Sequence, residues 1–288
     1  MKKILITGQN SYIGGMFIKW VEQWPDDYQV DEISVHGKDW KQKDFSTYDT
    51  VFHVAGIVHT KENKDNIDLF YKVNRDLTFE IAKKAKNDGV KQFIFMSTMN
   101  VYGVTSGVIT EDTICKPKTS YGKSKLEAEK LIEGLQDNKF NIATIRPPMV
   151  YGPNTVGNYV RLSKLAKITP VFPNIKNKRS MIYIDNLSEF IRLIIDEKDL
   201  GIFHPQNENY VRTSYMVQLI SEIHKETMFQ TKLFNPIIRF MSNINVVNKV
   251  FGDLIYSKSL SQYSKNYNYY NFYESIIETE MEPVIDDE

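Results

Sequence analysis

The sequence of 288 residues lacks most of the features that mark secreted, metal-binding and membrane-spanning proteins. Its single cysteine, Cys115, has no second cysteine with which to form an internal disulfide, and no cysteine and histidine cluster has the spacing of a zinc site. The 36 Lys and Arg are balanced by 36 Asp and Glu, so no overall positive field would hold DNA or RNA. No apolar run approaches the length of a membrane span, and the first, Ile4–Ile6, is too short for a signal peptide. These absences predict a soluble, cytoplasmic protein with no metal, no nucleic-acid partner and no membrane span.

The composition is that of an ordinary globular protein, with 42% hydrophobic and 25% charged residues, and the chain is long enough to bury a large core. Short apolar runs alternate with amphipathic stretches in the first half, which is the pattern of a parallel sheet covered by helices. Apolar residues that recur every four positions predict a crossover helix between the third and fourth strands. The strands are expected at Lys3–Thr7, Ile33–His36, Thr50–Val54, Gln92–Ser97 and Asn141–Arg146.

A further helix is expected at about Tyr121–Leu135, with Leu131 and Leu135 on one apolar stripe. After Arg146 the pattern changes to a region rich in proline and glycine, broken by shorter helices. We therefore expect the α/β class, with a Rossmann-type doubly wound parallel sheet in residues 1–150. Residues 151–288 would form a smaller substrate-binding part packed on it.

The first strand runs directly into a turn bounded by glycines and then into a helix. Glycine permits the sharp bend and removes the side chain that would keep a pyrophosphate away from the backbone amides of the helix N-terminus. Ser11 stands where the usual fingerprint has its middle glycine, so an ordinary strand-to-helix turn is the alternative. The cofactor-binding interpretation of this turn involves Gly8, Asn10, Ser11, Tyr12, Ile13 and Gly14.

Tyr121 and Lys125 are four residues apart and so share one face of their helix. A phenol has a usual pKa of ~10 and is a poor base at neutral pH, but an ammonium group one turn away favours its phenolate, as would a cationic nicotinamide ring. Tyr121 would then serve as a proton shuttle, unless the pair simply belongs to a surface helix. Ser97 and Thr98 follow the fourth strand, where ligands of open parallel sheets bind, although capping is the alternative role for such hydroxyls.

These motifs, in this order, resemble those of the extended short-chain dehydrogenase/reductases, and specifically the NAD-dependent epimerase/dehydratase family that acts on nucleotide sugars. The resemblance covers nearly the whole chain. Its motifs are TGxxxxIG at Thr7–Gly14, His53–Gly56, Asn74, STxxVYG at Ser97–Gly103, YGKSK at Tyr121–Lys125, Arg146–Pro153 and Arg179–Asp185.

The resemblance implies three catalytic residues: Thr98, which would hold the reacting oxygen, Tyr121 as the acid and base, and Lys125 as its partner. It implies that Asp44 and Phe45 hold the adenine, and that Arg179 grips the nucleotide diphosphate of the substrate. The remaining substrate contacts would be Thr98, Met99, Asn158 and Tyr159. The cofactor would also meet His36, Lys38, Val54, Ala55, Gly56, Asn74, Ser97, Tyr121, Lys125 and Pro148.

Two departures from the family pattern narrow the chemistry. Met99 and Asn100 stand where the family's sugar 4,6-dehydratases carry an Asp-Glu pair, which disfavours dehydration. After the expected second strand stand His36 and Lys38, where an NAD enzyme usually offers an acidic side chain to the ribose 2′-hydroxyl. This favours NADP as the cofactor, although nearby Asp39 keeps NAD open.

The resemblance therefore implies an NAD(P)-dependent nucleotide-sugar epimerase that acts by transient hydride transfer, at C4 of a UDP-hexose or N-acetylhexosamine. One alternative is an NADPH-dependent 4-keto-sugar nucleotide reductase, which would use the same residues. Another is a non-catalytic dinucleotide-binding regulator, but such relatives commonly lack the tyrosine and lysine pair. The resemblance also implies a homodimer formed through a helix bundle that contains the Tyr121 helix.

One apolar segment is not explained by these motifs. Pro236–Gly252 contains only Arg239 and Lys249 as charged residues. We expect a lid over the substrate site, with a helix at a membrane interface as the alternative.

Overall fold

The computed structural model describes residues 1–58, 60, 62–241 and 244–281, and the chain divides into two compact units. Unit 1 comprises Met1–Gly103, Ile114–Pro147 and Leu187–Pro205. Unit 2 comprises Val104–Thr113, Pro148–Asn186 and the chain from Gln206 onward. The chain passes from unit 1 to unit 2 after Pro147, close to the domain boundary expected at residue 150. The two units are interleaved in sequence, however, because the chain returns to unit 1 after residue 186 and completes its sheet.

Unit 1 is built on a six-stranded sheet in which all neighbouring strands are parallel. The order is β10-β6-β4-β3-β1-β2, so the chain starts next to the edge, forms the edge strand β2, and then crosses β1 and winds the other way through β3, β4, β6 and β10. This confirms the α/β class and the doubly wound parallel sheet. The strands are β1 (Lys2–Thr7), β2 (Tyr28–Ile33), β3 (Thr50–His53), β4 (Gln92–Met96), β6 (Asn141–Ile145) and β10 (Gly201–Phe203).

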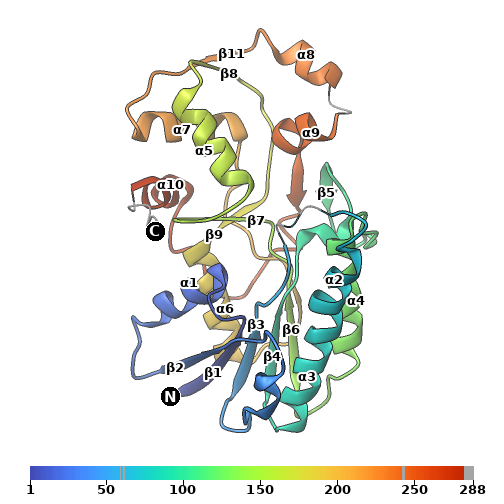
Figure 1. Cartoon of the computed structure of the whole chain (residues 1–288). Helices are drawn as coiled ribbons and strands as arrows, with labels where there is room; N and C mark the ends of the chain where they lie inside the picture. Colours follow the sequence, from blue (N-terminus) through green and yellow to red (C-terminus); the bar gives the residue numbers. More distant parts are fainter. Residues whose placement is uncertain (59, 61, 242–243, 282–288) are drawn as a thin grey trace. The chain divides into compact units, whose positions relative to one another are not determined.

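Helices cover both faces of this sheet, as Figure 1 shows. One face carries α1 (Tyr12–Val21) and α6 (Ile184–Glu197), of which the part from Leu187 belongs to unit 1. The other face carries α2 (Ile67–Tyr71), the π-helical turn η2 (Lys72–Leu77), α3 (Thr78–Asn87) and α4 (Ser120–Glu133). Two short 3-10 turns, η1 (Asp39–Gln42) and η3 (Met99–Tyr102), lie in the loops.

The core under α3 and α4 forms because alternate residues of the strands point to that face. Leu5, Val51 and Phe93 lie in it with Ile132, and all four side chains are fully buried. The adjacent Leu131 is 41% exposed, so its predicted place on the apolar stripe is wrong. Ile132, the next residue of α4, lies in the core instead. Leu135 packs against the core, as expected.

The second strand lies earlier in the chain than Ile33–His36, the position predicted from the apolar residues there. It covers Tyr28–Ile33 and includes Asp31 and Glu32. Charged residues are tolerated because β2 is the edge strand of the sheet, so one of its sides is not enclosed by a neighbouring strand. Val35 is buried in the core outside the strand, which is why the segment after the strand also looked apolar.

The short strand β10 was not predicted. It has only three residues, Gly201–Phe203, and joins the sheet by pairing in parallel with β6. Tertiary context, rather than a long apolar run, makes this segment a strand.

Unit 2 consists of three two-stranded parallel ribbons and several helices. The ribbons pair β5 (Gly107–Ile109) with β12 (Leu254–Tyr256), β7 (Met149–Tyr151) with β9 (Met181–Tyr183), and β8 (Val171–Pro173) with β11 (Phe229–Thr231). The helices are α5 (Asn158–Ile168), α7 (Thr213–Ile223), α8 (Asn235–Phe240), α9 (Asn245–Phe251) and α10 (Phe272–Met281). The described part of residues 236–252 thus contains α9 and most of α8, and the lid expected there stays a prediction. No helix within the described part of the chain is both long and apolar enough to cross a membrane.

Candidate active site

The glycine-bounded turn joins β1 to α1, and its backbone lies directly against the turn that follows β3. Gly8 has a φ of +126°, and a Cβ atom there would lie 2.8 Å from the backbone nitrogen of Ala55. The close approach of these two turns therefore requires glycine at this position. Asn10 follows with a φ of +62°, a left-handed conformation that asparagine tolerates.

Ser11, which replaces the middle glycine of the usual fingerprint, is the N-cap of α1. Its Oγ accepts a hydrogen bond from the backbone nitrogen of Gly14 at 3.2 Å. Tyr12 and Ile13 form the first turn of the helix, where backbone N–H groups have no acceptor within the helix itself. The turn thus has the strand, bend and helix N-terminus that a pyrophosphate site requires.

The turn after β3 contains Val54, Ala55 and Gly56, and Asn74 holds it in place. Asn74 is fully buried in η2; its Oδ1 accepts from the backbone nitrogen of Ile57 at 2.8 Å and its Nδ2 donates to the backbone oxygen of Ile57 at 3.1 Å. The amide of Asn74 also donates to Ser124 Oγ at 3.2 Å. Asn74 therefore positions the predicted cofactor turn against α4 with a side chain whose polar atoms are already bonded to the protein.

A side chain at residue 56 would crowd this arrangement and force its neighbours to shift by a few tenths of an ångström. The Cβ atom of any residue other than glycine would lie 3.0 Å from Asn74 Oδ1 and 3.1 Å from Lys125 Nζ. The absence of a side chain at Gly56 lets the lysine on α4 reach the end of the sheet.

Thr98, Tyr121 and Lys125 come together at the carboxyl end of β4. Thr98 follows this strand, and its side chain forms a hydrogen bond with that of Tyr121 on α4. The helix begins one residue before Tyr121, where Thr119 caps it by accepting from the backbone nitrogen of Gly122 at 3.1 Å. Lys125, one turn further, is 2% exposed and donates from Nζ to the backbone oxygen of Met96 at 2.9 Å. The three residues predicted to be catalytic therefore form one cluster in unit 1.

Burial dominates the acid-base behaviour of this cluster. It raises the pKa of Tyr121 to about 12, opposed by the hydrogen bond with Thr98, which favours the phenolate. Burial lowers the pKa of Lys125 to about 7, opposed by the negative charge of Glu129. The pKa of the phenol is thus raised, not lowered as expected from the neighbouring lysine. The hydrogen bond with Thr98 favours the phenolate and partly offsets the effect of burial.

Glu129 was not predicted as a site residue, yet it lies one turn beyond Lys125 and joins a buried ion pair. Its two carboxylate oxygens accept hydrogen bonds from Arg146, at 3.1 Å from Nε and 2.6 Å from Nη2. Ser97 also donates its hydroxyl to Glu129, so the side chain of this predicted cofactor contact is directed into the ion pair. Glu129 continues the four-residue spacing of Tyr121 and Lys125, and this spacing was the sequence signal that could have identified it.

The chain of contacts extends beyond the ion pair. Nη1 of Arg146 donates to Tyr102 Oη at 2.8 Å, and Tyr102 Oη is 2.7 Å from His204 Nε2. Burial, together with the charge of Arg146, lowers the pKa of His204 to about 3, so the imidazole stays neutral. Met99, a predicted substrate contact, is the first residue of η3, the turn that also contains Tyr102, and it is buried.

The predicted ribose and adenine contacts lie after β2. His36 and Lys38 are exposed in the loop, because the strand already ends at Ile33. Asp44 is exposed, and hydrogen bonds from Ser46 lower the pKa of its carboxyl group. Phe45 is fully buried in the core cluster, so its ring is not on the surface.

Because β2 ends earlier than predicted, an acidic side chain, Glu32, lies near the carboxyl end of this strand. Glu32 is the last but one residue of β2, and its Oε1 is buried with no hydrogen-bond partner among the described residues. A buried carboxylate oxygen is normally hydrogen-bonded, which makes Glu32 a candidate to accept a hydrogen bond from a ligand. Its neighbour Asp31 is already paired, since its Oδ2 accepts from Tyr48 at 2.7 Å.

The other predicted site residues belong to unit 2. Pro148 is buried, and Asn158 is exposed at the first turn of α5. Tyr159 is 3% exposed and donates its hydroxyl to Glu280 at 2.8 Å, so its polar atom is already paired. Arg179 is partly buried and donates to the backbone oxygen of Gly252 at 3.2 Å, and burial lowers the pKa of its guanidinium.

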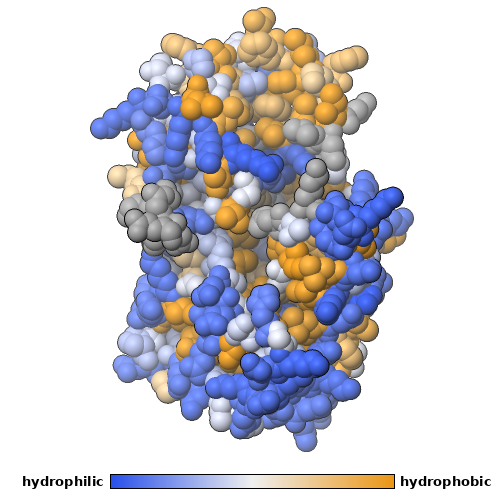
Figure 2. All heavy atoms as spheres, in the orientation of Figure 1, coloured by the Kyte–Doolittle hydropathy of each residue, from blue (hydrophilic) through white to orange (hydrophobic). Residues whose placement is uncertain are grey.

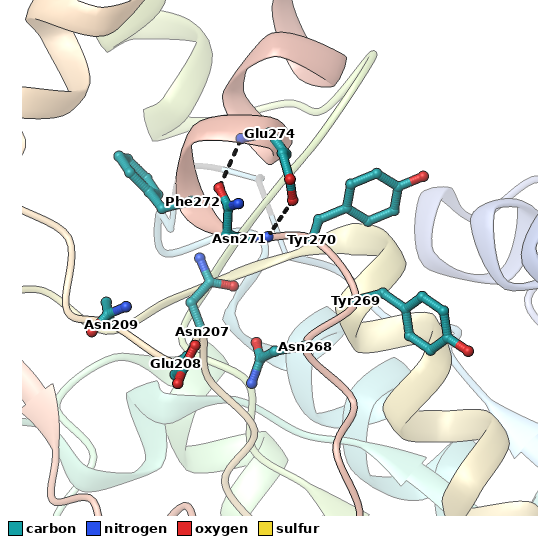
Figure 3. Close-up of a pocket in the computed structure, with 9 residues that line it drawn as sticks. All are labelled: Asn207, Glu208, Asn209, Asn268, Tyr269, Tyr270, Asn271, Phe272 and Glu274. Atoms are coloured by element: carbon teal, nitrogen blue, oxygen red, sulfur yellow. Dashed lines mark hydrogen bonds between the residues drawn. The ribbon is translucent and has the colours of Figure 1, made fainter.

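Unit 2 also contains a polar cavity of about 300 Å³ beside the start of α10 (Figure 3). Asn271 and Glu274 cap this helix reciprocally, each accepting from the backbone nitrogen of the other, at 3.1 and 3.0 Å. The cavity lining is Asn207, Glu208, Asn209, Asn268, Tyr269, Tyr270, Asn271, Phe272 and Glu274. Because the lining includes two glutamates and no lysine or arginine, it does not suit a diphosphate. Within the described residues, no group of three or more His, Cys, Asp or Glu could hold a metal ion.

Known proteins share both the sequence and the fold. Residues 4–207 match the model of the family described as NAD dependent epimerase/dehydratase. A UDP-glucose 4-epimerase of Vibrio cholerae is 33% identical over 236 residues, which cover 73% of this chain and 69% of that protein. N-acetyl-alpha-D-glucosaminyl-diphospho-ditrans,octacis-undecaprenol 4-epimerase of Escherichia coli O157:H7 is 29% identical over 62% of this chain and 54% of that protein.

Among solved structures, UDP-glucuronic acid 4-epimerase of Bacillus cereus in complex with NAD is similar over 96% of this chain and 97% of that one. The TM-score is 0.72 and the sequence identity is 19%. This likeness supports the fold of the chain, in agreement with its sheet topology.

Proposed function

The chain belongs to the NAD-dependent epimerase/dehydratase family, and from this premise we propose that it is a 4-epimerase of a nucleotide-activated sugar. The observation that carries the proposal is the cluster of Thr98, Tyr121 and Lys125 at the carboxyl end of β4. The two sequence relatives described above are both 4-epimerases, and they favour this reaction over reduction.

A bound nicotinamide dinucleotide would supply the hydride acceptor and donor, together with a positive ring in its oxidised form. The side chains of the protein would remove and return the hydroxyl proton of the sugar. Thr98 hydrogen-bonds the reacting oxygen and the phenol, and Tyr121 accepts the hydroxyl proton of the sugar and later returns it. Lys125 adds positive charge below its pKa of about 7, which favours the phenolate.

We propose that the cofactor is NAD, not the NADP favoured by the sequence. Glu32 supports this, because its unpartnered buried Oε1 would accept a hydrogen bond from a ribose 2′-hydroxyl, whereas a 2′-phosphate would meet a like charge. The glycine turn before α1 would hold the pyrophosphate. Asp44 and Phe45 remain proposed adenine contacts.

Unit 1 would thus bind the cofactor and carry the catalytic residues, and unit 2 would contribute substrate contacts. Asn158 and Arg179 are the better candidates in unit 2, because the hydroxyl of Tyr159 is already bound to Glu280. The enzyme is further proposed to act as a homodimer.

The test is turnover of UDP-glucose, UDP-galactose and their N-acetylhexosamine counterparts by the purified protein with no cofactor added. We expect interconversion at C4 with NAD retained on the protein, detected by mass spectrometry, and weaker binding of NAD by Glu32→Gln. Stoichiometric consumption of NADPH with a 4-keto sugar nucleotide would replace the epimerase with a reductase. Binding of NAD without turnover of any sugar nucleotide would indicate a regulator.

A further inference from the structure

One end of unit 2 exposes large apolar side chains that folding normally buries. They lie on the ribbon of β8 and β11 and on α8, where Figure 2 shows hydrophobic residues gathered over these elements. Phe240 is 89% exposed, Ile168 78% and Leu233 77%. We call this surface the apolar tip; it comprises Ile168, Val171, Phe229, Leu233, Phe234, Ile237 and Phe240.

The apolar tip is continuous, because its parts are joined by pairing and hydrogen bonds. Val171 of β8 lies opposite Phe229 of β11 in the ribbon. Asn235, the first residue of α8, donates from Nδ2 to the backbone oxygen of Asn174 at 3.0 Å, which ties the helix to the segment after β8. Isolated exposed apolar residues are ordinary, but a continuous group of this size marks an interaction surface.

The two chain segments that supply the apolar tip contain basic residues but no acidic ones. The whole chain has equal numbers of acidic and basic residues, with on average one Asp or Glu in every eight residues. In contrast, residues 149–184 and 227–252 contain no Asp or Glu. These two runs, which supply the apolar tip, contain Arg161, Lys164, Lys167, Lys176, Lys178, Arg179, Lys232, Arg239 and Lys249. Two of these cations are set apart from the others: Lys167 is neutralised by Glu280 at 3.1 Å, and the partly buried Arg179, which interacts with Asp253, is the proposed substrate contact.

We propose that the apolar tip binds the surface of an anionic lipid bilayer. Aromatic and aliphatic side chains can enter the boundary between headgroups and acyl chains, while nearby lysines and arginines attract anionic headgroups. Each cation close to such a surface contributes about 1 kcal/mol, so several of them add appreciably to the apolar contribution. A second copy of the chain fits less well, because a symmetric dimer through this face would bring two cationic surfaces together.

The test is sedimentation of the full chain with vesicles of phosphatidylcholine alone or with one third phosphatidylglycerol. We expect binding to the anionic vesicles that weakens as salt is added. The double variant Phe229→Ser with Leu233→Ser should lose binding by about tenfold or more, since it removes two apolar side chains that are 68% and 77% exposed. The matched control is Leu200→Ser with Ile202→Ser in unit 1, where the side chains are 51% and 50% exposed, and it should bind as the wild type does.

Three outcomes would overturn the proposal: no sedimentation of the wild type, equal binding to neutral and anionic vesicles, or unchanged binding of the tip variant. A dimer that forms in gel filtration and is lost only in the tip variant would identify a second copy as the occupant. Turnover of a nucleotide sugar without vesicles should be the same for the wild type and the tip variant. Failure of membrane binding would therefore be distinguished from failure of the proposed enzymatic function.

Discussion

Units 1 and 2 each bury a glutamate, but they assemble its partners in different ways. In unit 1, Glu129 lies on the same helix as Tyr121 and Lys125 at successive four-residue intervals, and only Arg146 and Ser97 come from other elements. In unit 2, the Glu280 side chain on α10 is 3% exposed, and all its partners are distant in sequence. These partners are Tyr159, Ser163, Lys167 and His224.

The difference shows which kind of site a sequence reveals. Residues spaced four apart on one helix share a face regardless of how the rest of the chain folds. The three members of the unit 1 cluster on α4, Tyr121, Lys125 and Glu129, can therefore be found from their spacing alone. The Glu280 cluster has no local spacing, because α5, α7 and α10 supply its members and only tertiary packing brings them together. Its effect should therefore be on stability, whereas that of the unit 1 cluster should be on the reaction.

The largest expected effect is on turnover and comes from replacing one phenol with a phenyl ring. Tyr121→Phe removes the proton carrier and should lower turnover about 10³-fold, with little change in melting temperature. The matched variant in unit 2 is Tyr151→Phe, which loses hydrogen bonds with Ser275 at 2.6 Å and with Asn207 at 2.8 Å. It should cost about 1–3 kcal/mol of stability and leave turnover largely intact.

Turnover assays and thermal unfolding of both variants would check this pair. If Tyr121→Phe kept near wild-type turnover, the assignment of the proton carrier would be wrong. If both variants lost turnover equally, the separation between a catalytic and a structural tyrosine would fail.

The next largest effect is expected in unit 2. Glu280→Gln should lower the free energy of unfolding by about 3 kcal/mol, because it removes a buried negative charge that pairs with Lys167. Burial alone would raise the pKa of Glu280, but hydrogen bonds from His224 and the other partners together outweigh it and lower this pKa below the usual 4.5 in the folded state. The carboxylate therefore stabilises the fold above about pH 4.5, and this contribution is lost as the pH falls through the folded pKa.

Urea unfolding of wild type and variant across this pH range would measure the difference, which should shrink in acid. Glu278→Gln is the control, since Glu278 is exposed on the same helix and should change stability by less than about 0.5 kcal/mol. A constant difference at every pH would mean that Glu280 acts through its shape and not through its charge.

The smallest expected effect is on turnover near pH 7 and comes from replacing Glu129. Its negative charge holds up the pKa of Lys125 against burial, so Glu129→Gln should lower that pKa further. Less Lys125 would be charged near pH 7, and turnover there should fall about tenfold, which corresponds to a change of about one pKa unit. The pH profile of turnover should move to lower pH, because the lysine is charged only below its pKa.

Glu189→Gln provides the matched control for this effect. Glu189 is also a buried glutamate of unit 1, paired with Arg192 at 2.7 Å, but it lies on α6. This variant should lose stability without moving the pH profile. A profile that does not move in Glu129→Gln would reduce Glu129 to a structural role.

Much of the fold could be predicted because strands buried on both faces leave continuous apolar runs. Four of the five expected strands coincide with β1, β3, β4 and β6 to within one residue. The two errors in the strands of the six-stranded sheet have local causes: β2 is an edge strand that tolerates Asp31 and Glu32, and β10 is too short to leave a pattern. Because the end of β2 was predicted too late in the chain, Glu32 was not considered as a ribose contact. The sequence therefore favoured NADP, whereas the structure leads us to propose NAD.

By itself the sequence determined the parallel sheet, the glycine turn and the placement of Tyr121 and Lys125 on one helix face, since these depend on continuous apolar runs, on a spacing of four residues and on the conformations open to glycine. Tertiary structure alone decided which groups surround them. It placed Thr98 against the phenol, shifted the pKa of Lys125 by burial, engaged Ser97 with Glu129 and collected the partners of Glu280. These outcomes depend on desolvation and on contacts between residues far apart in the chain, and no local pattern records them.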